Sequence, residues 1–296
     1  MKKIVGLGAC VLDTIISCKE FPPEDHKYCS DSIKTVIGGP VTNALLASAK
    51  LGVESHFVGC LADDDKGQIL LKQFNDNNVL TNSVKIIQNT QSFISYVILT
   101  SNGSRTCIFN RGNVPDNPNL INYSEIDNAT VLHLDGNYLR SSIECAKYAK
   151  NKGVKVSLDA GGLYAGIENL LPYVDVLIPS EEFALGLTGK ENVEDAILEI
   201  QKRYHPEILV VTQGVKGGCY IKDGGIQYYD SFKVNCVDSN GAGDVFHGAF
   251  LSAYCNGAKL EDCCKFASAV SALKCTKIGV TSALPTKEQV YEFLKK

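Results

Sequence analysis

The chain has 296 residues, of which 45% are hydrophobic and 21% are charged, and its formal net charge is −4. This length allows one large α/β domain or two small ones with a sizeable core. The slightly acidic balance gives no support for a nucleic-acid or an anionic-membrane partner. The longest apolar runs are too short to cross a bilayer, and the N-terminal stretch reaches Asp13 without the apolar core of a signal peptide. We therefore expect a soluble protein of the reducing cytoplasm.

The twelve cysteines are scattered through apolar runs, and no C-x-x-C pair occurs. Cys263 and Cys264 adjoin each other, but neighbours in a helix point to different faces. Buried reduced thiols are therefore the expected state, rather than disulfides or a zinc site.

Short, apolar, β-branched segments alternate with helical segments along the chain. This composition is typical of parallel strands that helices cover on both faces. The alternation predicts one doubly wound α/β domain over residues 1–296, with a mostly parallel sheet. The predicted strands are 2–11, 55–62, 129–136, 154–161, 173–180 and 207–214, and the predicted helical regions are 43–52, 67–78, 141–153, 181–189 and 243–274.

Two segments, 14–37 and 92–112, interrupt this alternation with strand-forming residues and no intervening helix. In the second segment, Asn102-Gly103 stands between two strand-like runs, which is the strongest short hairpin signal. We expect a small antiparallel sheet outside the main domain, which would be a lid, an oligomer surface or a decoration. Gly38 and Gly39 end the first segment and would form a hinge or a plain turn.

The stretch "VDSNGAGDVFHGAF", Val237 to Phe250, begins an apolar helix with small residues. Gly241, Ala242 and Gly243 have almost no side chain, so a ligand or another backbone segment can come close. The first amides of a helix and its dipole favour an anion at this point. Asp244 would then either cap the helix or take a proton from a substrate.

Three further clusters follow predicted strands, where open α/β sheets bind ligands. They are Asp13 after the first strand, Asn43 near a helix start, and the glycine-rich turn at Gly214, Gly217 and Gly218. Each has a structural alternative, because Asp13 can cap a turn, Asn43 can cap a helix and the glycines can form a tight turn. The chain has no G-x-x-x-x-G-K-[ST], and "GLGACV" lacks the third glycine of a dinucleotide fingerprint.

Together the clusters resemble the ribokinase-like (PfkB) carbohydrate kinases. "VDSNGAGDVFHGAF" resembles the C-terminal signature of that family, and "IGGPVTNALLASAKLG" resembles its N-terminal di-glycine signature. The resemblance continues in order through "GCLADDDKGQ", "GSRTCIF", "VTQG" and "ALKCTKIGVTSALP". It covers essentially the whole chain, and it is nearest in appearance to ketohexose and sulfofructose kinases.

The resemblance implies a role for each matched position. Asp244 matches the catalytic base, and the Gly241–Gly243 run matches the anion hole for the transferred phosphoryl group. Gly38 and Gly39 match the hinge of a lid. Substrate binding is implied for Asp13, Gly39, Asn43 and Asp244, and ATP binding for Ser180, Thr212, Gly214, Gly217, Gly241, Gly243 and Ser268.

The metal sites depart from the family pattern. The family's N-x-x-E aligns with the run Ser180 to Phe183, so Glu182 or Glu181 would have to hold Mg²⁺, unless both only complement the dipole of the next helix. Asp238 matches the monovalent-cation loop, but the last hydroxyl position of that loop is Ala283. Activation by K⁺ is therefore left open.

The implied activity is ATP-dependent phosphorylation of a primary hydroxyl of a small ketose-, fructose- or ribose-like sugar, with ATP and Mg²⁺ and in a homodimer formed through the lid. Arg105 and Arg111 would meet an anionic substrate group or be solvated on an edge strand. Two alternatives remain: a kinase of the same fold for a nucleoside or a vitamin alcohol, and a silent sugar- or nucleotide-binding regulator. The identity of the sugar is not predicted, because it depends on pocket geometry.

Overall fold

The computed structural model describes residues 2–101 and 104–295. Its main sheet has nine strands in the order β15-β14-β13-β12-β11-β10-β1-β4-β6. The strands from β13 to β6 are parallel, and β14 and β15 add an antiparallel edge. The expected doubly wound, mostly parallel α/β fold is confirmed. The strands are β1 (Lys3–Leu7), β4 (Glu54–Phe57), β6 (Val79–Leu80), β10 (Val131–Leu134), β11 (Lys155–Ala160), β12 (Val176–Pro179), β13 (Ile208–Thr212), β14 (Gly218–Lys222) and β15 (Gly225–Tyr229).

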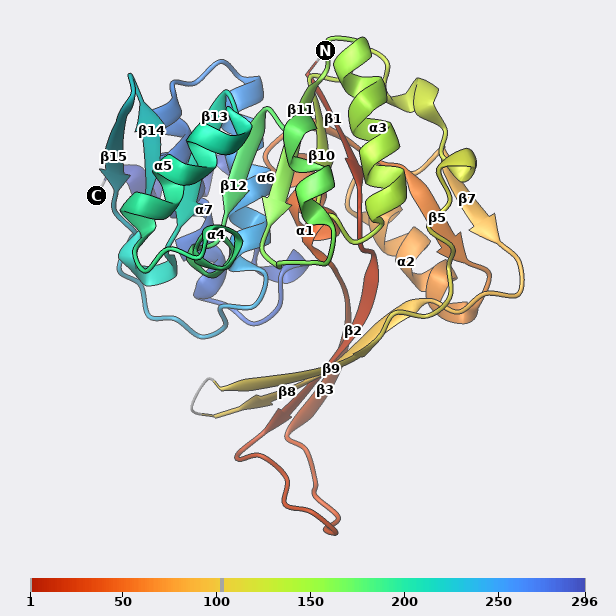
Figure 1. Cartoon of the computed structure of the whole chain (residues 1–296). Coiled ribbons are helices and arrows are strands. Elements are labelled where there is room, and N and C mark those ends of the chain that lie inside the picture. Colours follow the sequence, from red (N-terminus) through yellow and green to blue (C-terminus); the bar gives the residue numbers. More distant parts are fainter. Residues whose placement is uncertain (1, 102–103, 296) are drawn as a thin grey trace.

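Helices cover both faces of this sheet (Figure 1). One hydrophobic cluster includes Ile4 of β1 and Phe250, and the cluster on the other face includes Val5 and Phe183. Consecutive strand residues thus enter opposite cores, which is why the strands are continuously apolar. In the described ranges 2–101 and 104–295, no helix has the length and apolar character to cross a membrane. The first face carries α1 (Pro40–Lys50), α2 (Asp65–Asp76), α6 (Ala242–Cys255), α7 (Leu260–Cys275) and α8 (Lys287–Leu294), and the second carries α3 (Leu139–Asn151), α4 (Glu181–Thr188) and α5 (Val193–Tyr204).

The strand order reverses between β1 and β10. From β1 the chain moves outward through β4 to β6, and from β10 it moves in the other direction through β11 and β12 to β13. In open α/β sheets, ligands bind in the crevice at the carboxyl ends of the strands at such a reversal. The amide of Ala9, after β1, donates to Asp135 Oδ2, after β10, at 2.8 Å. The topology therefore locates the candidate site at this edge.

A second sheet, called the projecting sheet below, extends away from the main body (Figure 1). Within each of its two excursions the strands pair antiparallel, as expected. The central strands β2 and β8 pair in parallel, because both excursions leave the body in the same direction. The turn residues Asn102-Gly103 lie outside the described residues. The strands are ordered β3 (Ser32–Gly38), β2 (Val11–Cys18), β8 (Phe93–Thr100) and β9 (Arg105–Asn110).

Three predicted elements were wrong in extent, because each divides in two. The strand predicted over 2–11 ends at Leu7, and the backbone bends at Gly8, where a Cβ would lie 2.4 Å from the Asp135 carboxylate. Asp13 therefore lies inside the next strand, β2, and not at the end of the first. The segment 55–62 contains β4 and then β5 (Gly59–Ala62), which pairs with β7 (Val84–Ile87) in a separate sheet. The helical region 243–274 divides into α6 and α7, where Gly257 adopts a φ of 78°.

The cysteines are free, and most of them are buried. Cys29, Cys107 and Cys236 are exposed, so the expectation of burial was wrong for these three. Cys29 lies on the chain between β2 and β3, and Cys107 lies on β9, where there is no core to enter.

Candidate active site

The helix α6 begins at the small residues singled out in the sequence. Gly241 is its N-cap at φ 70°, and a Cβ there would lie 2.6 Å from Val280 Cγ2, so only glycine fits. The amide of Ala242 donates to the Ser239 carbonyl at 3.2 Å. A Cβ on Gly243 would meet no atom within 4 Å, so this residue faces open space. The first turn therefore offers an accessible, positively polarised backbone edge.

Asp244 is held by an asparagine of another helix. Asn43 Nδ2 donates to Asp244 Oδ2 at 2.7 Å, while the buried Asn43 Oδ1 has no partner among the described residues. Burial raises the pKa of the Asp244 carboxyl, and Asn43 and Lys274 oppose this shift. Asn43 lies in the first turn of α1, and Gly39 is the N-cap of this helix with a φ of 103°. A Cβ on Gly39 would lie 2.2 Å from the Ala9 carbonyl oxygen.

Asp13 enters the site from the projecting sheet. Ser95 Oγ donates to Asp13 Oδ1 at 2.5 Å, and a Cβ on Gly38 would lie 1.9 Å from Asp13 Oδ2. Burial, with a smaller contribution from Asp244, raises the pKa of Asp13 from 3.8 to about 6. Gly38 therefore leaves space for the Asp13 carboxylate, and Gly39 leaves space for the Ala9 carbonyl.

Two buried aspartates of this site were not predicted. Asp135 accepts hydrogen bonds from the amides of Ala9 at 2.8 Å and Asn137 at 2.9 Å. Asp159, at the end of β11, lies with Oδ1 3.4 Å from His247 Nε2, and its buried Oδ2 has no partner in the described chain. Burial and the nearby charge of Asp244 raise the pKa of Asp159. The signal that could have found both is an aspartate at the end of an apolar strand, in "LHLDG" and "VSLDAG".

A cavity of about 530 Å³ extends from Gly243 along α6 and α7. The Gly217 φ is 87°, and a Cβ there would lie 2.0 Å from the Tyr229 carbonyl oxygen. Ser268, on α7, donates its hydroxyl to the Asp230 carbonyl at 3.1 Å. The structure thus brings most of the predicted ATP-binding residues together in one cavity, where they are Thr212, Gly214, Gly217, Gly243 and Ser268.

The two candidate magnesium residues differ in their surroundings. Ser180 caps α4 and forms a β-bridge with Thr212. Glu181 Oε1 accepts from Gln213 Nε2 at 3.0 Å, beside the Gly214 turn, whereas Glu182 is exposed. Among residues 2–101 and 104–295, no group of three His, Cys, Asp or Glu side chains could hold a metal directly. The single carboxylate of Glu181 fits a Mg²⁺ ion that keeps most of its ligands from phosphates and water.

The Asp238 loop already contains a cation. Asp238 accepts hydrogen bonds from the amides of Asn240 at 2.9 Å and Gly279 at 2.8 Å. The Lys274 ammonium donates to the carbonyls of Asp238, at 2.9 Å, and of Asn240. A monovalent metal ion does not fit at these carbonyls, because the ammonium is bound to them.

The two arginines of β9 and the segment after it reach back to the main body. Arg105 donates to Asn240 Oδ1 at 3.2 Å, directly before the α6 N-cap. Arg111 donates to Asn137 Oδ1 at 2.8 Å, and its guanidinium lies 5.5 Å from the Phe93 ring centroid. Neither side chain is simply solvated.

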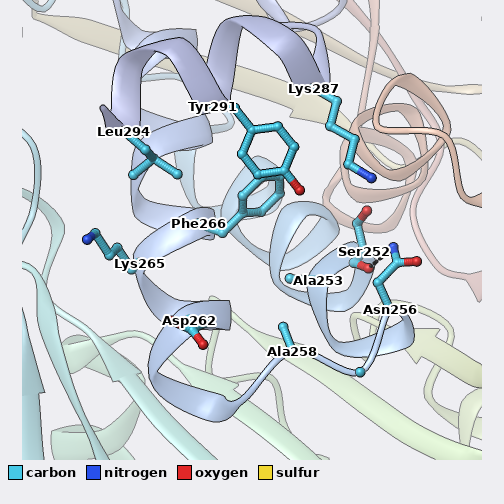
Figure 2. Close-up of a pocket in the computed structure, with 11 residues that line it drawn as sticks. Ser252, Ala253, Asn256, Ala258, Asp262, Lys265, Phe266, Lys287, Tyr291 and Leu294 are labelled. Atoms are coloured by element: carbon cyan, nitrogen blue, oxygen red, sulfur yellow. Dashed lines mark hydrogen bonds between the residues drawn. The ribbon is translucent and has the colours of Figure 1, made fainter. Parts of the chain in front are cut away.

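A separate cavity of about 460 Å³ lies at the far end of α6 (Figure 2). Phe266 and Tyr291 lie side by side in it, with ring centroids 6.0 Å apart, and Lys265 and Lys287 lie near its edge. None of the predicted site residues is among the described residues that line it. The chemistry is therefore assigned to the edge of the sheet.

Comparisons with known proteins identify the family of the chain. The family profile described as "pfkB family carbohydrate kinase" matches residues 1–287. A ribokinase of Haemophilus influenzae is 25% identical over 99% of both chains. The probable chloroplastic fructokinase-6 of Arabidopsis thaliana is 30% identical over 99% of this chain and 82% of that protein. The solved structure of Arabidopsis thaliana ribokinase with ribose and ATP is 26% identical, with a TM-score of 0.85 over 100% of this chain and 99% of that chain. The chain therefore belongs to the PfkB family of carbohydrate kinases and is an ATP-dependent sugar kinase.

Proposed function

We propose that this kinase transfers the γ-phosphoryl group of ATP to a primary hydroxyl of a small ribose-like or fructose-like sugar, with Asp244 as the base. One observation carries the proposal: Asp244 stands in the first turn of α6, bonded to Asn43 and next to the open edge at Gly243. A base and an anion-stabilising backbone edge are the two parts that phosphoryl transfer needs side by side.

Asp244 would accept the proton of the attacking hydroxyl through its carboxylate. Its pKa is raised by burial, which makes it a stronger base than a solvated aspartate, while the Asn43 hydrogen bond keeps one oxygen oriented. The γ-phosphoryl group would lie against the first turn of α6, where the Gly243 amide stabilises the charge on its oxygens. The cavity that extends from Gly243 to Thr212 and Ser268 would hold the rest of ATP.

The sugar would lie between the projecting sheet and α1. Asp13, the free Oδ1 of Asn43 and the free Oδ2 of Asp159 are hydrogen-bond acceptors around Asp244, and sugar hydroxyls are donors that satisfy them. Gly39 would let the sugar approach the backbone. Burial of the Asn43 and Asp159 oxygens without partners among the described residues costs free energy, so a polyol is favoured over an apolar ligand.

We place Mg²⁺ between Glu181 and the phosphates of ATP. Bound there, the ion would neutralise charge on the phosphate oxygens. Glu181 would hold it through water, and Lys216, whose Nζ lies 3.8 Å from Glu181 Oε2, would add a positive charge at the same turn. K⁺ is not part of this proposal, because Lys274 occupies the Asp238 loop.

The projecting sheet, which spans the proposed lid segments 14–37 and 92–112, would close over the sugar. It carries Asp13 into the site, and Arg105 connects it to Asn240 beside the anion-binding edge. Closure about Gly38 and Gly39 would exclude water that competes for the phosphoryl group.

We also propose a homodimer formed through the outer face of the projecting sheet. In its register, Ile16 pairs with Ile33 and with Ile98, and Tyr96 pairs with Ile108, so these five side chains share one face. Asp13 and its partner Ser95 lie on the opposite face. An exposed apolar sheet face of this kind is typical of a contact surface, and the free thiols agree with a reducing cytoplasm.

The test is coupled ADP release with ATP and Mg²⁺ over ketoses, aldoses, phosphosugars, sulfosugars and nucleosides. Asp244→Asn should lower kcat about 10²- to 10⁴-fold, since a general base contributes that much, while calorimetry still detects ATP binding. Asp31→Asn, at an exposed aspartate directly before β3, is the matched control. Full activity of Asp244→Asn would refute the assignment of the base, and turnover of nucleosides alone would refute the sugar.

A further inference from the structure

Lys274 is a buried ammonium on α7. Of the lysines in the described ranges it is the one that is fully buried, with 0% of its surface exposed. Lysine is almost never found in this state unless its charge is compensated. The compensation here comes from two backbone carbonyls, of Asp238 and Asn240, and from the Asp238 carboxylate, whose Oδ2 lies 3.7 Å from Lys274 Nζ.

These contacts require the charged form of the side chain. The two carbonyls and the carboxylate are all acceptors, and only the protonated ammonium has three N–H donors to match them. Burial lowers the pKa of Lys274, and the Asp238 carboxylate opposes that shift. The ammonium is therefore a resident positive charge inside the loop.

The loop that Lys274 holds leads directly into the anion-binding edge. The amides of Val237 and Asp238 donate to the Cys275 carbonyl at 2.8 and 3.1 Å, which ties the loop to the end of α7. Asn240, whose carbonyl Lys274 binds, precedes Gly241, the N-cap of α6. The charge of Lys274 also reaches Asp244, where it favours the carboxylate form that accepts a proton.

Carbonyl oxygens together with a carboxylate are ligands that a monovalent metal ion also uses. An ammonium is a compact, strongly hydrated point charge that can take the place of such an ion. We infer that the Lys274 ammonium serves as the loop's built-in monovalent cation, so that Lys274 is a positioning residue for the anion-binding edge and the kinase needs no K⁺. This inference rests on the proposed function only where its test measures kinase activity.

The first measurement is on the wild-type protein. Its kcat and KM for ATP should change less than about 2-fold when 100 mM choline chloride is replaced by KCl, because this exchange keeps the ionic strength and its screening constant. A several-fold activation by K⁺ in this exchange would overturn the inference.

The second measurement uses Lys274→Ala, which leaves space at the carbonyls, and Lys274→Met, which fills the space without a charge. Lys274→Ala should lose at least 10-fold in kcat and regain most of it with K⁺ or NH₄⁺, but not with tetramethylammonium. Lys274→Met should stay impaired in all salts. A role in packing alone would be repaired by Met and not by an ion, and that pattern would overturn the inference.

Thermal unfolding provides the readout that does not depend on turnover. The Tm of Lys274→Ala should rise saturably with K⁺ or NH₄⁺ relative to choline, while the Tm of the wild type should not change. If the wild type phosphorylates no sugar but this Tm difference is seen, the proposed function fails and the inference stands. If Lys274→Ala folds, as judged by circular dichroism, and neither its Tm nor its kcat responds to the cations, the inference fails. An Ala variant too unstable to fold in every salt contradicts it as well, since K⁺ or NH₄⁺ should restore the fold.

Discussion

Replacing Asp13 with asparagine should stabilise the fold while damaging the kinase. Burial raises the pKa of Asp13 from 3.8 to about 6, so the folded protein disfavours the carboxylate that is present at neutral pH. One pKa unit corresponds to about 1.4 kcal/mol, so the charged side chain costs the fold about 3 kcal/mol at pH 8. Asparagine has the same shape and can still accept the Ser95 hydroxyl, whose oxygen lies 2.5 Å from Asp13 Oδ1.

The sign of the pH dependence follows from the raised pKa. The penalty is absent below the unfolded-state pKa near 3.8, grows as pH rises, and is complete above about 6. The gain in the free energy of unfolding for Asp13→Asn should therefore be about 3 kcal/mol at pH 8 and about half of that at pH 5. The sugar kcat/KM should fall about 10²-fold or more, because the variant presents an amide where a hydroxyl donates to a carboxylate.

Urea unfolding at pH 5 and pH 8 measures the first effect, and coupled ADP release measures the second. Asp31→Asn, at an exposed position directly before β3 of the same sheet, should change the free energy of unfolding by less than about 0.5 kcal/mol at both pH values. Equal stabilisation of Asp13→Asn at the two pH values, or none at pH 8, would refute the burial argument.

Two further changes test the metal site and the dimer. Glu181→Gln should raise the Mg²⁺ concentration for half-maximal rate about 10-fold, because it removes an outer-sphere ligand. Glu182→Gln, on an exposed side chain, should leave that concentration unchanged. If only Glu182→Gln raises it, the metal is held by Glu182 instead. Ile108→Lys changes a side chain that is 58% exposed on the projecting sheet, and it should convert the dimer to a monomer in sedimentation equilibrium. Ile69→Lys, at a side chain 41% exposed on α2, should leave the dimer intact. A wild-type protein that is monomeric would refute the proposed contact.

The sequence was most informative where a local pattern determines both the backbone and the chemistry. The small residues before Asp244 predicted a helix N-terminus open to an anion, and α6 begins at Ala242. Asn43 was expected near a helix start, and α1 begins three residues earlier at Pro40. In both cases the backbone conformation is determined by residues that are neighbours along the chain. The apolar periodicity and the positions of the glycines are therefore sufficient to predict where the helix begins.

What the sequence could not show depends on contacts between distant segments. The helical region that contains Lys274 is apolar, and periodicity alone indicates a core position there. The Lys274 ammonium donates to the carbonyls of Asp238 and Asn240, and this contact depends on how α7 packs beside α6. The break of the first predicted strand likewise lies at a long-range contact, because the Asp135 carboxylate, more than 120 residues away, occupies the space beside Gly8.

The charges of the site are separated into a negative side and a positive side. Asp13, Asp159 and Asp244 place carboxylates, each with a raised pKa, on the side of the proposed sugar. The Gly243 edge and the Lys274 ammonium place positive potential on the side of the proposed phosphoryl group. The carboxylates repel an anion and accept hydrogen bonds from hydroxyl groups, whereas the positive edge attracts the anion, so one orientation of the two substrates is favoured before they make close contacts. Asn43 Oδ1 and Asp159 Oδ2, which are buried without a partner among the described residues, destabilise the empty protein. A sugar that donates to them should therefore raise the Tm even without ATP.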